Sequence, residues 1–469
     1  MITYLCRAGR ISPHVTAGAL PDNVLLDIFE FYRAEHYEIN WWPWIRLVHV
    51  CRWWRYVVFG SPLRLDLSLR CTPKSPVRET LGVWPRLPIE VFLEHPDGLP
   101  LDNIISIFEH RDRIRKIHCL NLTYSQLERL LPMMLEPFPA LTSLTLWTLW
   151  DLGATLALPN MFLGGSAPRL QSLSLRRIQF PGLPRLLFSA TDLSQLSFSG
   201  IRRANHISPE AIVTCLSGLT RLRHLTIIFE LPALPHSQHP PLTRSIFPAL
   251  KWLEFRGGIE YLEDLVARIN APQLDILHIS FWNEVFFDIQ QLPYFIDHTG
   301  IFRSYNHAVL TLFNTEARIN LSPSKEMDSS KRLDFGVYCN PANREVLSMV
   351  YICSHLLPLP SIVEQLDIQV GSDQESTWQV VMEGTQWLAL FRVFTAVRTL
   401  RISLKLQTLI LPALQELTGE RAMEVLPALD SLYLEGYQPS GSDQQAIKPF
   451  IASRQNSDRP VTVHLWEGR

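Results

Sequence analysis

The stretch "RLQSLSL" (169–175) carries a pattern that returns along most of the chain. "RLRHLTI" (221–227), "ALKWLEF" (249–255) and "QLDILHI" (273–279) repeat it as apolar-x-x-Leu-x-apolar. In each copy, apolar and polar residues alternate around a central leucine. This alternation is typical of a short strand that buries one face. The sequence therefore predicts a strand at every copy.

The copies recur at the spacing of a structural repeat. Twelve central leucines can be aligned: Leu120, Leu144, Leu173, Leu196, Leu225, Leu253, Leu277, Leu310, Leu333, Leu366, Leu400 and Leu432. Neighbouring leucines are 23 to 34 residues apart, which overlaps the period of leucine-rich repeats, roughly 20–29 residues. Leu67 and Val91 continue the series towards the N-terminus.

Helical patterns lie between the predicted strands. In "ISPEAIVTCLSGL" (207–219), Ser208 suits the N-cap and Pro209 the first helical position. Residues 124–135 and 261–269 have the same character. We therefore expect the fold class α/β, with a small helical N-terminal part before an irregular leucine-rich-repeat solenoid. In such a solenoid a curved parallel sheet is lined by helices, and no repeat is stable alone.

The expected organisation has three parts. These are an N-terminal tail (1–19), a small helical module (20–65) and the solenoid (66–469), with loop insertions near 231–243, 322–332, 371–377 and 437–445. A closing helix is expected at 444–454.

The composition excludes several classes of function. The net charge of −2 lacks the basic excess of nucleic-acid binders, and no apolar run is long enough to span a membrane. The seven cysteines form no CxxC pair, which indicates a reducing compartment, cytoplasmic or nuclear. We found no phosphate loop, GxSxG or HExxH motif, so we expect neither enzymatic activity nor a cofactor or metal.

The N-terminal module consists of two amphipathic stretches, "LPDNVLLDIFEFYR" (20–33) and "LVHVCRWWRYVVFGSP" (47–62). Both predict helices, and Cys51 is expected on the buried face of the second. A module of under 50 residues rarely has a sufficient core of its own. We expect it to pack against the solenoid, against another protein, or against both.

This module resembles an F-box. The residues that carry the resemblance are Leu20-Pro21, Leu25-Leu26, Ile28-Phe29, Leu47, Val50-Cys51-Arg52 and Trp54-Arg55. The whole chain is similar to the F-box proteins with degenerate leucine-rich repeats found in mushroom-forming fungi. The resemblance implies a substrate-receptor subunit of a cullin-RING ubiquitin ligase that docks on the adaptor Skp1. The residues that would bind Skp1 are Leu20, Pro21, Leu25, Ile28, Phe29, Leu47, Val48, Cys51 and Trp54. The chain departs from the family by its insert at 34–44.

Two alternatives for the module stay open. It could only cap the solenoid in an interaction scaffold with no ubiquitin role, since terminal repeats need a polar outer face. Docking on an adaptor predicts that Leu20, Pro21, Ile28 and Phe29 are partly exposed, whereas a cap would bury them. A less favoured hypothesis is base stacking by the aromatic cluster, which is Trp41, Trp42, Trp44, Trp53 and Trp54 beside Arg46, Arg52 and Arg55.

In the solenoid, the informative side chains are those that alternate away from the core. The candidates for binding a substrate protein are Trp147, Arg176, His224, Trp252, Glu254, Arg256 and His278. Exposed tryptophans are frequent anchors of protein interfaces. Adjacent repeats should bring Trp252, Glu254 and Arg256 beside His224 and His278, which predicts a binding patch.

Overall fold

The computed structural model describes most of the chain. The described residues are 20–36, 43–72, 81–93, 102–149, 157–180, 183–202, 207–230, 244–282, 289–299, 305–313, 316–323, 332–338, 353–354, 362–371, 384–417, 419–436 and 442–467. Contacts within the chain divide it into two compact units, Met1–Leu170 and Gln171–Arg469. This division lies among the repeats, and the boundary expected near residue 65 stays a prediction.

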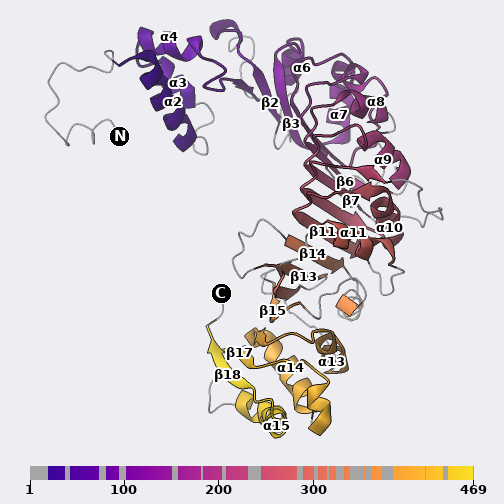
Figure 1. Ribbon diagram of the computed structural model, residues 1–469. Coiled ribbons are helices and arrows are strands. Elements are labelled where there is room, and N and C mark those ends of the chain that lie inside the picture. The colour runs from indigo at the N-terminus through magenta and orange to yellow at the C-terminus, as the bar shows by residue number, and fades with distance from the viewer. Residues whose placement is uncertain are drawn as a thin grey trace, which may run out of the picture. The chain divides into compact units, whose positions relative to one another are not determined.

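The described part of unit 1 begins with three helices, α2 (Asp22–His36), α3 (Pro43–Val48) and α4 (Arg52–Gly60), drawn in indigo in Figure 1. Their shared core contains Leu25, Phe29, Val48 and Val58, all fully covered. The same cluster continues through Leu65, Leu67, Leu69 and Leu87. The module therefore packs on the segments that lead into the first strands, and they enlarge its core.

The second helical stretch is broken, which corrects the expectation of one helix across residues 47–58. The helix α3 ends at Val48, and Cys51 takes the extended conformation of an N-cap, where its Sγ accepts the Trp54 amide at 3.4 Å. Cys51 is exposed, so its expected burial is wrong. The pattern of apolar residues did not reveal this break, because both short helices bury residues of the same stretch.

The strands of unit 1 are parallel neighbours. They are β1 (Leu69–Cys71), β2 (Ile89–Leu93), β3 (Ile114–Leu122) and β4 (Ser143–Thr148). Helical segments accompany them: α6 (Asp102–Phe108), α7 (Tyr124–Leu130), η2 (Leu131–Met134) and η3 (Phe162–Gly165). Thr123 and Gln126 form a capping box that begins α7, since each side chain accepts the other residue's amide.

Two predicted repeat positions of unit 1 are wrong. In β3, Ile117 rather than Leu120 pairs with Leu144, and further along the strand the register shifts between Cys119 and Leu122, where Asn121 has φ of 55°. Residues 62–66 form a turn, closed by the hydrogen bond from the Leu67 amide to the Pro62 carbonyl, so that Leu67 precedes β1.

In the described part of unit 2, twelve strands form one sheet. In sheet order they are β5 (Ser172–Arg176), β6 (Gln195–Ile201), β7 (His224–Phe229), β9 (Trp252–Gly257), β11 (Ile276–Trp282), β14 (Arg332–Tyr338), β13 (Glu316–Ser322), β12 (His307–Leu312), β15 (Gln365–Val370), β16 (Thr399–Ile402), β17 (Ser431–Glu435) and β18 (Thr462–Trp466). A small separate pair consists of β8 (Ser245–Ile246) and β10 (Ile269–Asn270).

One row of apolar residues crosses this sheet with one member from each strand. The row is Leu173, Leu196, Leu225, Leu253, Leu277, Leu333, Leu321, Ala308, Leu366, Leu400, Leu432 and Val463. Nine of them are predicted central leucines. Leu310 is also buried, but it lies two residues after the row position Ala308 on β12 and pairs with Ile319 and Ile368.

The strand β13 interrupts the parallel order, and the sequence did not predict it. It runs antiparallel between β12 and β14, and β12 continues parallel to β15. The connection from Phe313 to Glu316 is short and closed by a backbone hydrogen bond of 2.8 Å. So short a connection can only join antiparallel strands, whereas a parallel pair needs a crossover of a dozen residues or more.

Helices cover one face of the unit 2 sheet. They are α8 (Leu183–Ser189), α9 (Pro209–Leu216), α10 (Ile259–Arg268), α11 (Gln291–His298), α13 (Gly384–Val393), α14 (Leu404–Gln415), η7 (Gly419–Met423) and α15 (Ser442–Asn456). Ser208 caps α9 as predicted, and α15 is the expected closing helix.

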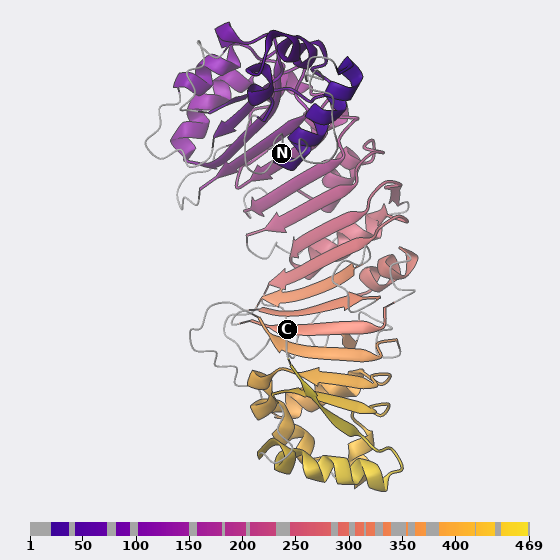
Figure 2. The same cartoon turned by 90° about the vertical axis from the view of Figure 1, so that its left-hand side faces the viewer.

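We call the other face, which carries Thr226, Glu254 and His278, the open face. Figure 1 shows α9, α10 and α11 on one side of the strands, and Figure 2 looks onto the other side, with the pink and orange strands in front. The predicted loop insertion at 231–243 lies outside the described residues, as do parts of the other three.

A fully buried arginine joins α15 to the last repeats. Arg454 donates to the carbonyls of Pro427 and Leu429 at 3.2 and 2.9 Å, just before β17. Arg454→Met leaves these carbonyls without the donor, which typically destabilises a structure by about 1–3 kcal/mol per group. We predict faster hydrogen exchange across residues 422–434. Lys448→Met, at an exposed position of the same helix, should leave exchange unchanged, and equal effects of the two variants would contradict this role.

Candidate functional site

The helix α2 has apolar residues on two faces. Leu25 and Phe29 are fully buried in the module core, and Leu26 is nearly so. Val24, Ile28 and Phe31 follow at helical spacing on another side and are 36%, 45% and 62% exposed. Pro21 continues this line at the start of the helix and is exposed. We call Pro21, Val24, Ile28 and Phe31 the α2 stripe.

The predicted adaptor-binding residues separate into two groups. Pro21, Ile28 and Cys51 are exposed, and Leu20 and Trp54 are half-buried. The remaining four, Leu25, Phe29, Leu47 and Val48, lie in the core of the chain itself.

The expectation that Phe29 is partly exposed is therefore wrong. Its ring packs on Trp54, with ring centroids 4.7 Å apart, and is completely covered. Phe29 and the other three buried residues stabilise the module but offer no surface to a partner. Val24 and Phe31, which the F-box pattern did not single out, take their place on the surface.

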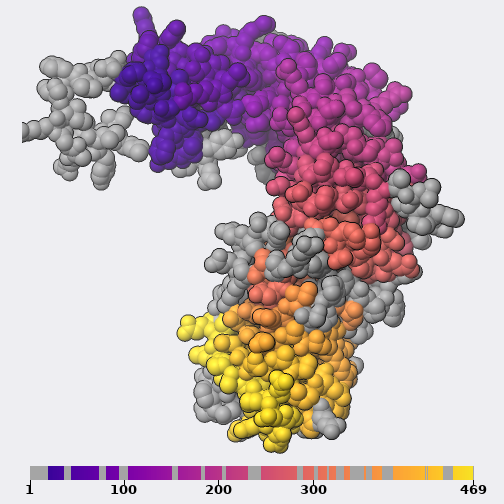
Figure 3. All heavy atoms as spheres, in the orientation of Figure 1, coloured from indigo at the N-terminus to yellow at the C-terminus, as the bar shows by residue number. Residues whose placement is uncertain are grey.

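A second apolar surface lies on α4 and just before it. Val50, Trp53 and Tyr56 are exposed, and the rings of Trp53 and Tyr56 stack with centroids 5.7 Å apart. Beside them is a hollow of about 630 Å³, lined by Asp22, Leu26, Arg52, Arg55, Tyr56, Val57, Phe59, Gly60 and Ser61. Figure 3 shows the atoms of this module in indigo. Trp41 and Trp42 of the predicted aromatic cluster lie outside the described residues, whereas Trp44 is buried.

Ion pairs fix α2 to the turn after α4. Arg64 pairs with Asp27 and Glu30, and Arg33 pairs with Asp66 at 3.4 Å. Burial alone would raise the pKa of Asp66, but Arg115, Lys116 and Arg33 hold the pKa below its usual value. Asp27, three residues after Val24 and four before Phe31, borders the α2 stripe, and Arg64 compensates its charge there.

The open face of unit 2 brings five predicted substrate-binding residues together. The strand β9 lies between β7 and β11, so that Trp252 is paired with His224 and Glu254 with His278. The rings of His224 and Trp252 are 6.4 Å apart, and Thr226 donates to Glu254 at 3.2 Å. Burial and Arg223 lower the pKa of His224, which favours its neutral form at pH 7. Arg176 lies on β5, two strands from β7, and Trp147 belongs to unit 1.

The patch is larger than the sequence predicted, because β13 and β14 supply charged residues. Asp334 is buried and pairs with His278 at 3.2 Å and with Arg332 at 3.4 Å. Arg318 pairs with Glu316 at 2.9 Å. None of these residues except His278 was singled out from the sequence, since only the insertion of β13 brings them together.

Beyond β12, a second polar group crosses the same face. Asp367 lies 3.2 Å from His307 and 3.6 Å from Arg401, whose guanidinium lies over Tyr433. Burial alone would raise the pKa of Asp367, but hydrogen bonds from His307 and Gln365 and the charge of Arg401 hold the pKa below its usual value. Asp367 therefore stays ionised, and the neighbouring Arg401 balances its negative charge.

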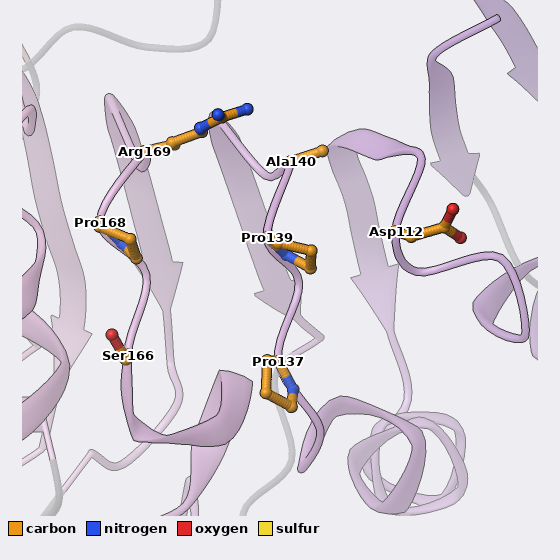
Figure 4. Close-up of a pocket in the computed structure, with 7 residues that line it drawn as sticks. All are labelled: Asp112, Pro137, Pro139, Ala140, Ser166, Pro168 and Arg169. Carbon is orange, nitrogen blue, oxygen red and sulfur yellow. The ribbon is translucent and has the colours of Figure 1, made fainter.

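Unit 1 carries a hollow of about 420 Å³ at the turns that precede its strands. Its lining is Asp112, Pro137, Pro139, Ala140, Ser166, Pro168 and Arg169, and Figure 4 shows these residues on three successive connections. Prolines and backbone form most of the wall, and the two charged side chains are widely separated in the view. No group of catalytic residues converges on this hollow.

The buried cysteines are unsuited to act as nucleophiles. Burial raises the pKa of Cys71 to about 11 and those of Cys119 and Cys353 to about 12, so these thiols are protonated at neutral pH. Within the described ranges, no group of His, Cys, Asp and Glu residues could hold a metal ion. Of the described helices, none has both the length and the hydrophobicity to cross a membrane.

Comparisons with known proteins add little. No family model matches the chain, and no curated protein matches it. Among solved structures, the leucine-rich repeat-containing protein LegL7 from Legionella pneumophila is similar, at 10% identity and a TM-score of 0.26, over 82% of this chain and 97% of that chain. A likeness this distant says nothing about function, so the surfaces of the chain itself must indicate what it binds.

The two faces of α2 lead to a direct prediction. Phe29→Ala removes a fully buried ring and should destabilise the module by about 3–5 kcal/mol, whereas Ile28→Ala should change its stability by less than about 1 kcal/mol. Hydrogen exchange of α2 and α4 in the full chain measures both effects. Equal acceleration of exchange by the two variants would show that the burial of α2 is assigned to the wrong side.

Proposed function

We propose that the chain is a non-catalytic substrate receptor of an SCF-type cullin-RING ubiquitin ligase, in the cytoplasm or the nucleus. In this proposal residues 20–65 act as an F-box that docks on a Skp1-like adaptor, and through it on a cullin. The repeats bind a substrate protein.

The observation that carries the proposal is the α2 stripe. An exposed line of Pro21, Val24, Ile28 and Phe31 is not needed for the core, because the buried face of α2 already fills it. Leaving such a line in water is unfavourable, and contiguous apolar surface of this kind marks an interaction site. An amphipathic helix that lays an apolar line into a partner's groove is a common mode of recognition. Of the F-box pattern, the Leu20-Pro21 pair directly precedes this helix and the Ile28-Phe29 pair lies on it.

The open face supports the second half of the proposal. Described helices cover only the opposite face, and Trp252, Glu254 and Arg256 are half-exposed beside His224 and His278. Charged and aromatic side chains on adjacent strands give a broad surface suited to a protein partner. We therefore expect recognition rather than chemistry on this face.

A second candidate has one observation in its favour. The core of the module continues into Leu65, Leu67 and Leu69 beside β1, as a simple cap of a repeat array would. In that case the chain is an interaction scaffold with no ubiquitin role.

A binding measurement separates the two candidates. The double variant Val24→Asp, Ile28→Asp puts two carboxylates on the α2 stripe without touching the core. Because a central interface residue typically contributes about 2 kcal/mol or more, capture of a purified Skp1-type adaptor should weaken at least about thirtyfold. The control Tyr294→Asp places a carboxylate at an exposed aromatic position of α11 and should bind like the wild type.

Two results would contradict the docking proposal. One is a wild-type chain that fails to bind the adaptor, and the other is a double variant that binds it with unchanged affinity. Either result would favour the scaffold with a capping module.

A further inference from the structure

Arg256 on the open face has an unusual environment. Its guanidinium lies 4.5 Å from the ring centre of Tyr338 and 5.9 Å from that of Trp282, and these two rings are 4.9 Å apart. Among the described residues no carboxylate forms an ion pair with Arg256. A half-buried guanidinium that rests on aromatic rings without a counter-charge is a ready site for an anion.

The carboxylates on this part of the open face already have other partners. Glu316 accepts both Nε and Nη2 of Arg318, at 3.1 and 2.9 Å. Asp334 is held by His278 and Arg332, and Glu254 accepts the hydroxyl of Thr226. In this neighbourhood three arginines (Arg256, Arg318 and Arg332) face three carboxylates (Glu254, Glu316 and Asp334), and among the described residues Arg256 and Glu254 take part in no ion pair.

Several polar atoms around Arg256 are buried without a hydrogen-bond partner. Four of them can donate: Arg256 Nε, Ser280 Oγ, Trp282 Nε1 and Asn320 Nδ2. Ser280 is fully buried. Buried donors are rarely left unsatisfied in native proteins, so a cluster of them points to an absent acceptor.

The register brings three of these donors to one place. Arg256 is paired with Ser280, and Trp282 follows Ser280 on the same face of β11. The next strand has Gly336 opposite Ser280. A Cβ at Gly336 would lie 2.6 Å from Glu316 Oε1 and 2.9 Å from Ser280 Oγ, so only glycine leaves room for these two groups above the sheet.

We propose that Arg256 and Trp282 bind the side-chain carboxylate of an acidic residue in an extended segment of a protein partner. The inference rests on the proposed function and names the class of substrate that the open face receives. The guanidinium and the indole N–H donate to the carboxylate, and the rings of Trp282 and Tyr338 cover the aliphatic part of the bound side chain.

The charge balance selects a carboxylate over a phosphate. The three arginines and three carboxylates here are balanced, so the site tolerates little negative charge beyond a single carboxylate close to Arg256. A phosphate carries nearly two charges at neutral pH, and the second would face Glu254 and Glu316 without a free cation. A segment with a glutamate or an aspartate therefore fits this site better than a phosphorylated one.

The test uses the full chain and an array of short synthetic peptides with varied flanking sequences. The peptides are made in sets of four that differ only at the central residue, which is Glu, Asp, Gln or phosphoserine. The Kd of the tightest Glu peptide is then measured by fluorescence anisotropy. For Arg256→Gln we expect binding to weaken about tenfold or more, the usual effect of losing a charged hydrogen-bonded pair. Trp282→Phe removes the indole donor but keeps a ring, and should weaken binding by a smaller factor.

Two further variants make the result specific. Arg256→Lys keeps the charge but loses the planar pair of donors, so its affinity should lie between those of the wild type and Arg256→Gln. Arg221→Gln removes the same charge at an exposed position of unit 2, where the arginine pairs with Asp192, and should bind like the wild type. Thermal unfolding shows whether each variant is folded.

Three outcomes would overturn the inference: no preference of the wild type for Glu over Gln, tighter binding of phosphoserine than of Glu, or unchanged affinity of folded Arg256→Gln. Capture of a Skp1-type adaptor by Arg256→Gln is measured in parallel and should be unchanged. If the wild type fails to capture the adaptor but Arg256 controls peptide binding, the ubiquitin role fails and the carboxylate site stands.

Discussion

The apolar row that crosses the unit 2 sheet is the constraint on which the rest of that unit depends. Each strand contributes one residue, such as Leu253 or Leu277, and each of these is covered by its neighbours and by the helices behind the sheet. A single repeat has only one or two such residues and could not bury them alone. The requirement fixes the register of every strand, because a shift by one residue would turn the leucines to the open face.

Once the leucines fix the register, the alternate positions are free to carry other chemistry. They place Thr226, Glu254, His278 and Asp334 in one line across four strands, and Arg256, Ser280 and Gly336 in the next. The insertion of β13 adds Arg318 and Glu316 to the same surface. The buried row therefore also determines where the charged surface lies. On this surface Arg256 forms no ion pair with a described residue.

The N-terminal module obeys a similar division between two faces, on a smaller scale. Phe29 and Leu25 are committed to the core with Trp54 and Val48, whereas Ile28, next to Phe29 in sequence, lies outside it. We propose that this outer line is what an adaptor recognises. The two proposed binding surfaces lie in different units and can be tested separately.

Much of this fold could be predicted from the sequence. The alternation around the leucines predicts the strands of unit 2, and Ser208-Pro209 predicts the start of α9, because both signals are local. The position of β13 could not be predicted in the same way: "EARINLS" alternates like the other strands but lacks the apolar residue that begins the repeat pattern. Leu120 was misplaced because the repeat pattern also fits three residues earlier in β3, where Ile117 and Cys119 pair with Leu144 and Leu146.

The candidate sites were harder to predict, because they depend on contacts between distant residues. An amphipathic pattern shows that Ile28 and Phe29 are both apolar, but only the packing of α3 and α4 decides which of them is buried. Glu254, Arg256 and His278 could be predicted from their alternation. Asp334, Arg318 and Glu316 could not, because their position beside His278 requires the unexpected hairpin of β12 and β13.

The most direct measurement of the central claim is hydroxyl-radical footprinting of the full chain with and without a purified Skp1-type adaptor. Phe31, exposed on the α2 stripe, and Tyr294, exposed on α11, are both oxidised in the free chain according to their exposure. The account predicts that the adaptor protects Phe31 and leaves Tyr294 unchanged. Unchanged oxidation of Phe31 at saturating adaptor, or equal protection of both residues, would contradict it.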